Sequence, residues 1–355
     1  MQNVTSISIA ALGLELAPAA LFGLMPEGIA RAVARWPAAL RVSVPALLVA
    51  PYALVSLSLH TFRWEWFAFY SALPVAIAWL LMRAATADPQ QRGDWRDAFI
   101  LLVLGLAVDL RWFDGAWPSG LRALNELLLV DAGLYGFLAI RQLSDTGFDF
   151  HLQWSDWKTG FRELAFFTPI VIALGLALGF IHPHRNLPGI GSALLRWVAI
   201  FFFTAVPEEL FFRAWVQNLL ERRVGRRAAL LTASILFGLS HFNKRSAHFN
   251  WRYVLLATIA GIFYGRAWRE HGVFRPRPLL MPASIGCGDC GSETFLEIAA
   301  TLAICFCRSH SFELDVPLHH PHRFLNPDYS MSDCGGMAFS EAGFHASIAI
   351  LPLRY

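Results

Sequence analysis

Long apolar blocks are the feature that most constrains how this chain of 355 residues can fold. A helix that crosses a bilayer needs about 20 mostly apolar residues, and blocks of roughly that length recur between residues 4 and 267. Hydrophobic residues make up 56% of the chain and charged residues only 15%, whereas soluble domains have about 25% charged residues. The sequence therefore predicts an all-α fold, a polytopic transmembrane helical bundle of about eight or nine spans.

The apolar blocks give nine candidate spans, at 4–24, 42–59, 66–82, 98–110, 123–140, 164–181, 193–210, 228–242 and 253–267. Two of them, 98–110 and 228–242, are short, which is typical of tilted or re-entrant segments. The first block has no basic segment before it, so we interpret it as a span and not as a cleaved signal peptide.

Lys and Arg alternate between the loops. Thirteen of them lie in the loops at 26–41, 83–97, 141–162 and 221–227, and eight lie in the intervening loops at 60–65, 111–122, 182–196 and 244–252. Because cytoplasmic loops are enriched in Lys and Arg, this pattern favours an external N-terminus and a cytoplasmic loop at 221–227. We expect an integral, multi-pass membrane protein, in a bacterial inner membrane. The net charge of +3 gives no reason to expect a nucleic-acid partner.

Ionisable residues at membrane depth mark the candidate site. Glu208, Glu209 and Arg213 follow the apolar run 197–205, where each charged residue costs about 2.5–3.5 kcal/mol on insertion scales. Residues four apart share a helix face, so Arg213 can neutralise Glu209 one turn earlier. Glu208 then remains as a candidate general base, because desolvation raises the pKa of a carboxyl group.

The next apolar block contributes Phe237 and His241, again four residues apart. Glu208 and His241 could together hold one water, either directly or through a divalent metal such as zinc, which takes His and carboxylate ligands. Two structural interpretations compete with this one. A Glu–Arg pair at a membrane boundary can simply lock two helices together, and a single histidine at a helix end often satisfies a backbone group.

The order Glu-Glu-x-x-x-Arg and then Phe-x-x-x-His resembles the first two motifs of the CAAX prenyl protease and bacteriocin-processing (CPBP, Abi) family of intramembrane proteases. The resemblance covers residues 194–269. It implies hydrolysis of a peptide bond within the bilayer, in which Glu208 and His241 activate the water. It also implies that Glu209 and Arg213 support the site. The implied partners are the lipid bilayer and a membrane-associated peptide or protein substrate.

A third family motif, His-x-x-x-Asn or His-x-x-x-Asp on a later span, is missing from this chain. His271 is followed four residues later by Arg275, and Pro and Gly then interrupt the expected helix. All five cysteines lie in the last 69 residues. We therefore interpret residues 275–355 as an aberrant or disordered tail that is out of frame after a reading-frame shift near Arg275. One permitted back-translation of residues 274–286 yields His-x-x-x-Asp when a single base is added.

The tail also has a rival interpretation as a soluble zinc domain. It would use the two closely spaced cysteine pairs, Cys287 with Cys290 and Cys305 with Cys307, together with nearby histidines. Their spacing fits no compact zinc finger well, and an isolated Cys-x-x-Cys is weak evidence.

The sequence thus divides into a multi-span N-terminal region at 1–163, a protease-like membrane core at 164–274 and the tail at 275–355. We interpret the protein as an intramembrane endopeptidase, a metalloprotease that acts in CAAX-type processing or in self-immunity. The alternative is a catalytically inactive membrane binding or immunity protein. A transport function is a third class, since Asp109, Glu126 and Asp131 also lie in or near spans, although helix pairing is their simpler explanation.

Overall fold

A computed structural model describes residues 6–118, 121–150, 154–181, 190–244 and 248–269. Within these ranges every regular element is a helix, which confirms the all-α prediction. The described part of each of the nine expected spans lies mostly in helices. The predicted tail at 275–355 lies outside the described residues, so its interpretation stays a prediction.

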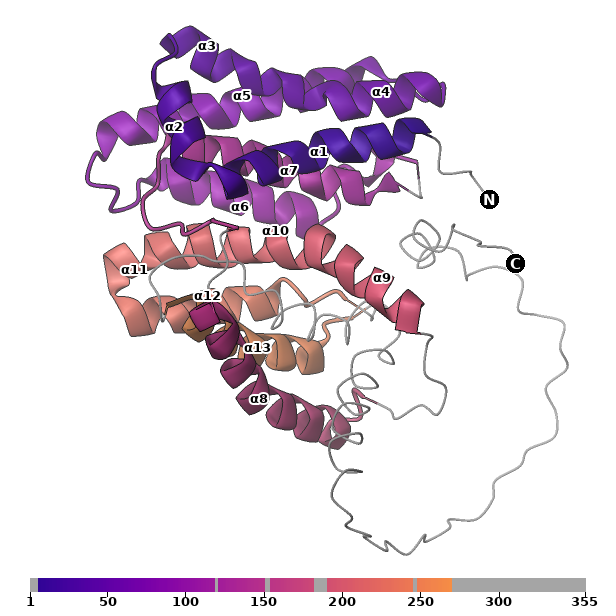
Figure 1. Ribbon diagram of the computed structural model, residues 1–355, viewed down its shortest axis with the longest axis vertical. Coiled ribbons are helices and arrows are strands. Elements are labelled where there is room, and N and C mark those ends of the chain that lie inside the picture. The colour runs from indigo at the N-terminus through magenta and orange to yellow at the C-terminus, as the bar shows by residue number, and fades with distance from the viewer. Residues whose placement is uncertain (1–5, 119–120, 151–153, 182–189, 245–247, 270–355) are drawn as a thin grey trace, which may run out of the picture.

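The helices form two groups that lie one above the other in Figure 1. The first group consists of α1 (Ser6–Leu24), α2 (Pro26–Ala34), α3 (Ala38–Ser43), η1 (Val44–Val49), α4 (Ala50–Ser58), α5 (Trp64–Ala87), α6 (Trp95–Asp109), η2 (Asp114–Ala116), α7 (Ala123–Leu134) and η4 (Tyr135–Ile140). The second group consists of α8 (Trp154–Ala177), α9 (Ile190–Ile200), η5 (Phe201–Ala205), α10 (Val206–Glu209), η6 (Leu210–Gln217), α11 (Asn218–Val224), α12 (Arg226–Leu239) and α13 (Trp251–Arg269).

Five segments of the described chain are long and apolar enough to cross a membrane. They are Ser6–Leu24, Ala38–Ser58, Trp64–Ala87, Ala123–Ile140 and Trp154–Ala177. The other four predicted spans lie in shorter or more polar helices. Helix α6, for example, has 15 residues, and α13 carries three arginines. Large apolar side chains such as Leu47 (72% exposed) and Trp64 (73% exposed) face outward, as expected of a surface in contact with lipid.

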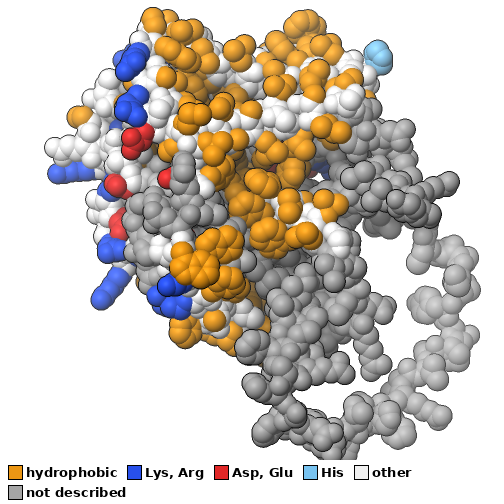
Figure 2. Space-filling model, in the orientation of Figure 1, with side chains coloured by type: hydrophobic (Ala, Val, Ile, Leu, Met, Phe, Trp, Pro, Cys, Tyr) orange, Lys and Arg blue, Asp and Glu red, His pale blue; other side chains and the backbone are white. Residues whose placement is uncertain are grey.

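Charged side chains gather along one edge of the molecule, beside a broad hydrophobic face (Figure 2). The loops predicted to be cytoplasmic contact one another there. Gln91 Nε2 donates to Gln142 O at 2.8 Å, and Gln142 Nε2 donates to Ala30 O at 3.4 Å. Arg222 at the end of α11 donates to Gln91 O at 3.1 Å. These contacts place four of the arginine-bearing loops on one side of the bundle, in agreement with the predicted topology.

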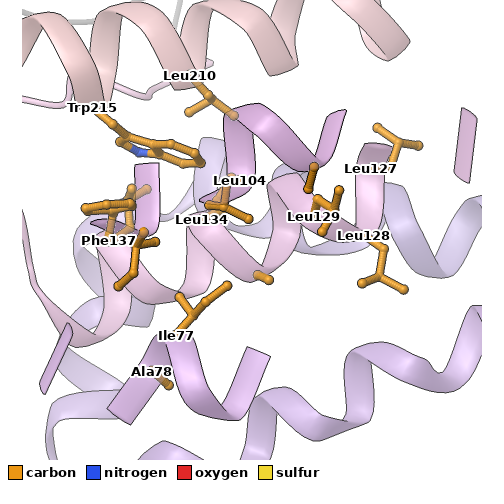
Figure 3. Close-up of a cluster of buried hydrophobic side chains, with 14 of the residues drawn as sticks. Ile77, Ala78, Leu104, Leu127, Leu128, Leu129, Leu134, Phe137, Leu210 and Trp215 are labelled. Carbon is orange, nitrogen blue, oxygen red and sulfur yellow. The ribbon is translucent and has the colours of Figure 1, made fainter. Parts of the chain in front are cut away.

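The two helix groups share one hydrophobic core. Leu104 of α6 and Phe137 of η4 belong to the same cluster of buried side chains as Leu210 and Trp215 of η6 (Figure 3). A second cluster lies among α8, α9, η5, η6, α12 and α13 and contains Phe167, Phe212 and Phe237. Helix α8 runs across the predicted boundary between residues 163 and 164, and the division into an N-terminal region and a core stays a prediction.

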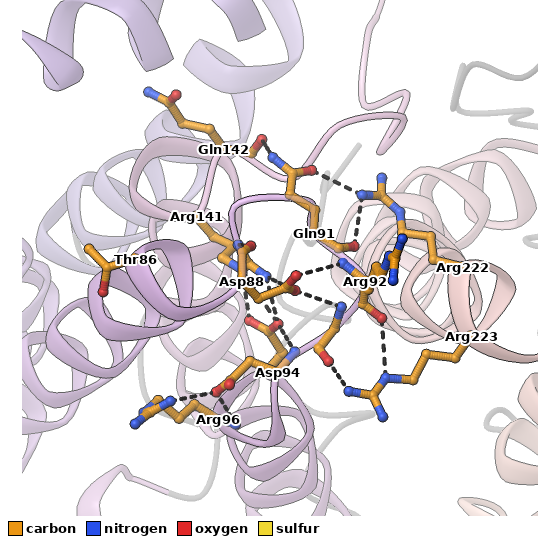
Figure 4. Close-up of polar contacts among 12 residues, drawn as sticks. Thr86, Asp88, Gln91, Arg92, Asp94, Arg96, Arg141, Gln142, Arg222 and Arg223 are labelled. Carbon is orange, nitrogen blue, oxygen red and sulfur yellow. Dashed lines mark hydrogen bonds and ion pairs between the residues drawn. The ribbon is translucent and has the colours of Figure 1, made fainter.

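A buried ion-pair network holds the connection between α5 and α6 (Figure 4). The Arg141 guanidinium is 1% exposed, with Nε 3.1 Å from Asp97 Oδ1 and Nη2 2.7 Å from Asp88 Oδ2. Asp94 and Asp97 form a capping box at the start of α6, which satisfies backbone N–H groups that have no partner within the helix. The network therefore fixes the α5–α6 loop against the end of η4.

Asp88 makes the stability of this loop dependent on pH. Burial acts to raise the pKa of Asp88, but hydrogen bonds from the Arg92 and Gly93 backbone and from Arg141 outweigh it, so the pKa lies below its ordinary value. Stability from this group is therefore present above the unfolded-state pKa of about 3.9 and is lost as the pH falls through the lower folded-state pKa.

We expect Asp88→Asn to lower the thermal unfolding midpoint at neutral pH. Below about pH 4, the stability of Asp88→Asn should fall less with decreasing pH than the stability of the wild type. Thermal unfolding in detergent across this pH range measures both effects. Glu27→Gln is the control, because the Glu27 side chain is 87% exposed. Equal acid sensitivity of the wild type and Asp88→Asn would contradict the assignment.

Candidate active site

One long helical segment carries the predicted carboxylates. Helices α9, η5, α10, η6 and α11 follow one another without a break from Ile190 to Val224. The four residues of α10 lie between η5 and η6, which are both π-helical. Wide turns of this kind are rare and occur frequently at functional sites. Glu208 and Glu209 therefore lie in a locally irregular part of an otherwise regular helix.

Glu209 and Arg213 form the ion pair that helical spacing predicts. Arg213 Nε lies 3.6 Å from Glu209 Oε1, the Arg213 side chain is fully buried, and Glu209 is 19% exposed. The guanidinium carbon lies 5.3 Å from the centroid of the Phe237 ring, which is within the range of a cation–π interaction. The ion pair with Glu209 lies within one helical segment, and the ring contact with Phe237 joins that segment to α12.

His241 lies just beyond the end of α12, in the turn that follows Leu239. Its Nδ1 lies 2.8 Å from the Phe237 carbonyl oxygen. Because a carbonyl oxygen can only accept, we assign the proton to Nδ1, and Nε2 is then the nitrogen that can accept a proton or bind a metal. The imidazole is 7% exposed and packs against the rings of Phe237 and Tyr253, each at 4.9 Å between centroids.

The turn at Gly225 sets the depth of the two candidate catalytic groups. Gly225 has φ of +79°, a conformation that favours glycine, and it separates α11 from α12. Phe212 and Phe237 lie on opposite sides of this turn, thirteen and twelve residues away, and their rings meet at 5.1 Å. Glu208 and His241 each lie four residues, about one turn, beyond these phenylalanines. Because the two phenylalanines meet, we infer that Glu208 and His241 lie at a similar depth in the hairpin.

Helix α13 completes the surroundings of this site, with residues that sequence reasoning did not single out. Tyr264 is buried, its ring lies 6.0 Å from that of Phe237, and it interacts electrostatically with Glu208, Glu209 and Arg213. The positions of Tyr253, Ala257, Ala260 and Tyr264 have the spacing of one helix face, and this was the available signal. Their facing helix could not be identified from that spacing alone.

Ion pairs anchor the far end of the same helices. Arg266 of α13 lies 3.5 Å from Glu163 of α8, whose side chain is fully buried. Arg269 and Arg226 each lie 3.1 Å from Glu221 of α11. These contacts connect α8, α11, α12 and α13 at the arginine-bearing face, away from His241.

The described residues contain no complete set of metal ligands. Within the described ranges, no group of three or more His, Cys, Asp or Glu side chains could hold a metal ion. Catalytic zinc sites use three protein ligands, and the candidate site offers Glu208 and His241. These two residues alone do not complete a zinc site. The cysteines and histidines of the predicted zinc domain in the tail lie outside the described residues.

The acidic residues considered for a transport path lie on two different helices. Asp109 ends α6, and its backbone carbonyl accepts a hydrogen bond from Asn243 at 3.0 Å. Glu126 and Asp131 lie on α7, where Asp131 is buried and interacts electrostatically with Glu15 of α1. Asp131 thus faces α1 and not the candidate site.

Residues 190–276 match a family model described as Rce1-like, type II CAAX prenyl endopeptidase. The match begins with α9, includes α10–α13 and contains all four predicted site residues, Glu208, Glu209, Arg213 and His241. No curated protein and no solved structure matches the chain.

Close packing of α12 against α13 positions His241, and we expect it to depend on Gly238. A Cβ atom at Gly238 would lie 1.9 Å from Thr258 Oγ1 and 2.6 Å from the Val254 carbonyl oxygen. Gly238→Ala must therefore push the helices apart, which we expect to destabilise the protein by about 1–3 kcal/mol. Thermal unfolding in detergent measures the loss.

The matched control is Gly13→Ala in α1, where an added Cβ would meet no atom within 4 Å. Thr258→Ala should restore part of the stability of Gly238→Ala, because it removes the nearest clashing atom. Equal unfolding midpoints for Gly238→Ala and Gly13→Ala would show that the close approach of α12 and α13 is wrong.

Proposed function

We propose, from the premise that residues 190–276 form a domain of the type II CAAX prenyl endopeptidase family, that this integral membrane protein hydrolyses a prenylated substrate at a peptide bond near its C-terminus. The family match supports a CAAX-type intramembrane endopeptidase. The substrate class, a membrane-associated peptide or protein with a lipidated cysteine, is our inference from the family description. Location in a bacterial inner membrane is likewise an inference, supported by the apolar helices and the arginine-bearing face.

The observation that carries this proposal is the contact between the Phe212 and Phe237 rings, from which we infer a similar depth for Glu208 and His241. The Phe212–Phe237 contact aligns the two arms of the hairpin, and both candidate groups lie one turn beyond it. A general base and a histidine on neighbouring elements can hold one water between them when they share the same depth. Because Glu209 forms an ion pair with Arg213, we assign the role of general base to the adjacent carboxylate, Glu208.

In the proposed reaction, Glu208 removes a proton from a water that His241 orients through Nε2. The resulting hydroxide attacks the carbonyl carbon of the scissile peptide bond and forms a C–O bond. The C–N bond then breaks, and Glu208 returns the proton to the departing amine. The hydrogen bond from His241 Nδ1 to the Phe237 carbonyl holds the ring in the required tautomer.

We expect Glu208→Gln and His241→Ala each to lower the cleavage rate by about 10²–10⁴-fold, because each removes a group that handles the attacking water. The assay uses purified protein in proteoliposomes and a quenched fluorescent peptide with a farnesylated cysteine followed by three residues. Glu65→Gln is the matched control, since the Glu65 side chain is 71% exposed and lies outside the family match.

Full cleavage by both Glu208→Gln and His241→Ala would contradict the assignment of these residues. Failure of the wild type to cleave the farnesylated peptide would favour the alternative, a membrane binding or immunity protein that uses the same residues without hydrolysis. This alternative is supported by the absence of the third family motif from the sequence.

A divalent metal such as zinc stays a prediction, with Glu208 and His241 as the described residues that could bind it. If the prediction is correct, active protein contains about one metal ion per chain, and His241→Ala contains clearly less. Elemental analysis of the purified wild type and variant measures the content. Active protein that contains no stoichiometric metal would contradict the prediction.

A further inference from the structure

The N-terminal helices lie outside the family match, yet they pack directly against the helix that carries Glu208. Trp215 of η6 is fully buried and stacks on Phe137 of η4, with 5.1 Å between ring centroids and 26° between planes. Figure 3 shows the Trp215 ring directed from its helix toward Phe137 and Leu134. The largest fully buried side chain of η6 thus packs against the N-terminal region.

Two aromatic side chains of η6 pack closely against two glycines of the N-terminal region. A Cβ at Gly133 of α7 would lie 2.7 Å from Trp215 Cη2, and one at Gly105 of α6 would lie 3.0 Å from Phe211 Cζ. Small residues allow close approach of helices in membranes, where the hydrophobic effect does not drive one helix onto another. Phe211 and Trp215 follow Glu208 by three and seven residues, within two turns on the same helical segment.

Polar contacts fix the other end of this helical segment to the same region (Figure 4). Arg222 of α11 donates to Gln91 Oε1 at 3.0 Å and to the Ser144 carbonyl oxygen at 2.6 Å. Arg223 donates to the backbone carbonyl oxygens of Arg92 and Gly93. The segment from Glu208 to Arg223 is therefore held against the N-terminal region at several points along its length.

We propose that the N-terminal region is a positioning platform for the catalytic helix, and that the contact of Trp215 with Gly133 sets the rotation and depth of Glu208. Trp215 and Gly133 are positioning residues that act through the helix and not by touching substrate. This inference rests on the proposed function for its activity readout. It assigns a role to residues 6–148, which the family match does not cover.

The test compares two glycines on neighbouring turns. Gly133→Ala places a methyl group against Trp215 of the catalytic helix. Gly136→Ala places one 2.6 Å from Leu81 Cδ1 of α5, a similar clash that lies entirely within the N-terminal region. A general loss of packing would affect both variants, whereas a positioning defect would affect only the first.

We expect Gly133→Ala to lower kcat for the farnesylated peptide by about 10-fold or more with little change in KM, because small misplacements of reacting groups have large effects on rate. Gly136→Ala should keep kcat within about twofold of wild type. Trp215→Phe makes room for the added methyl group, so the double variant Gly133→Ala/Trp215→Phe should return to the rate of Trp215→Phe alone. Equal losses in the two glycine variants, or no recovery in the double variant, would overturn the platform.

Hydrogen–deuterium exchange separates this inference from the proposed function. We expect peptides covering residues 206–217 to exchange faster in Gly133→Ala than in wild type or Gly136→Ala. If the wild type fails to cleave the peptide but this exchange pattern holds, the proposed function fails and the platform stands. Unchanged exchange in Gly133→Ala would overturn the platform, whatever the activity.

A second pair of variants covers the case in which Gly133→Ala does not fold. Arg222→Gln removes the donors to Gln91 and Ser144, while Arg227→Gln, on the exposed start of α12, removes a nearby arginine without those contacts. We expect only Arg222→Gln to lower kcat and to raise exchange at 206–217, with partial recovery in Arg222→Lys. Identical behaviour of Arg222→Gln and Arg227→Gln would overturn the platform.

Discussion

The buried ion pair between Glu209 and Arg213 is the interaction around which the membrane core is arranged. The Arg213 side chain is fully buried, and an uncompensated charge in the protein interior destabilises a protein by several kcal/mol. Glu209 supplies the opposite charge, and Phe237 supplies the face of its ring. The pair compensates the buried charge within one helical segment, and the contact of Arg213 with the Phe237 ring links that segment to α12.

Contacts between small residues and larger side chains position the helices that carry Glu208 and His241. On one side, Gly238 allows α13 to approach α12, which fixes the turn that carries His241. On the other side, Gly133 receives Trp215, which fixes the helix that carries Glu208. Because lipid is as apolar as these side chains, shape complementarity and not hydrophobic burial selects the arrangement. The candidate site thus depends on close contacts made on both faces of one helical hairpin.

Much of this arrangement could be predicted from local patterns in the sequence. Apolar blocks predicted the helices, and spacings of four residues predicted the Glu209–Arg213 pair and the proximity of Phe237 to His241. Contacts between distant helices could not be predicted in this way. The contacts of Tyr264, of Trp215 with Gly133 and of Arg222 depend on which helix faces meet. The family match ends at residue 276, next to the predicted change of reading frame near Arg275, and the DNA sequence there tests that prediction.

The central claim is that water attacks a peptide bond at the site formed by Glu208 and His241. Its most direct test is mass spectrometry of the products formed from a farnesylated peptide in ¹⁸O-labelled water. We predict that the wild type releases a tripeptide and leaves a new carboxylate on the farnesylated cysteine that contains ¹⁸O, and that Glu208→Gln yields neither product at a comparable rate. Intact peptide after incubation with the wild type, or equal product from Glu208→Gln, would contradict the account.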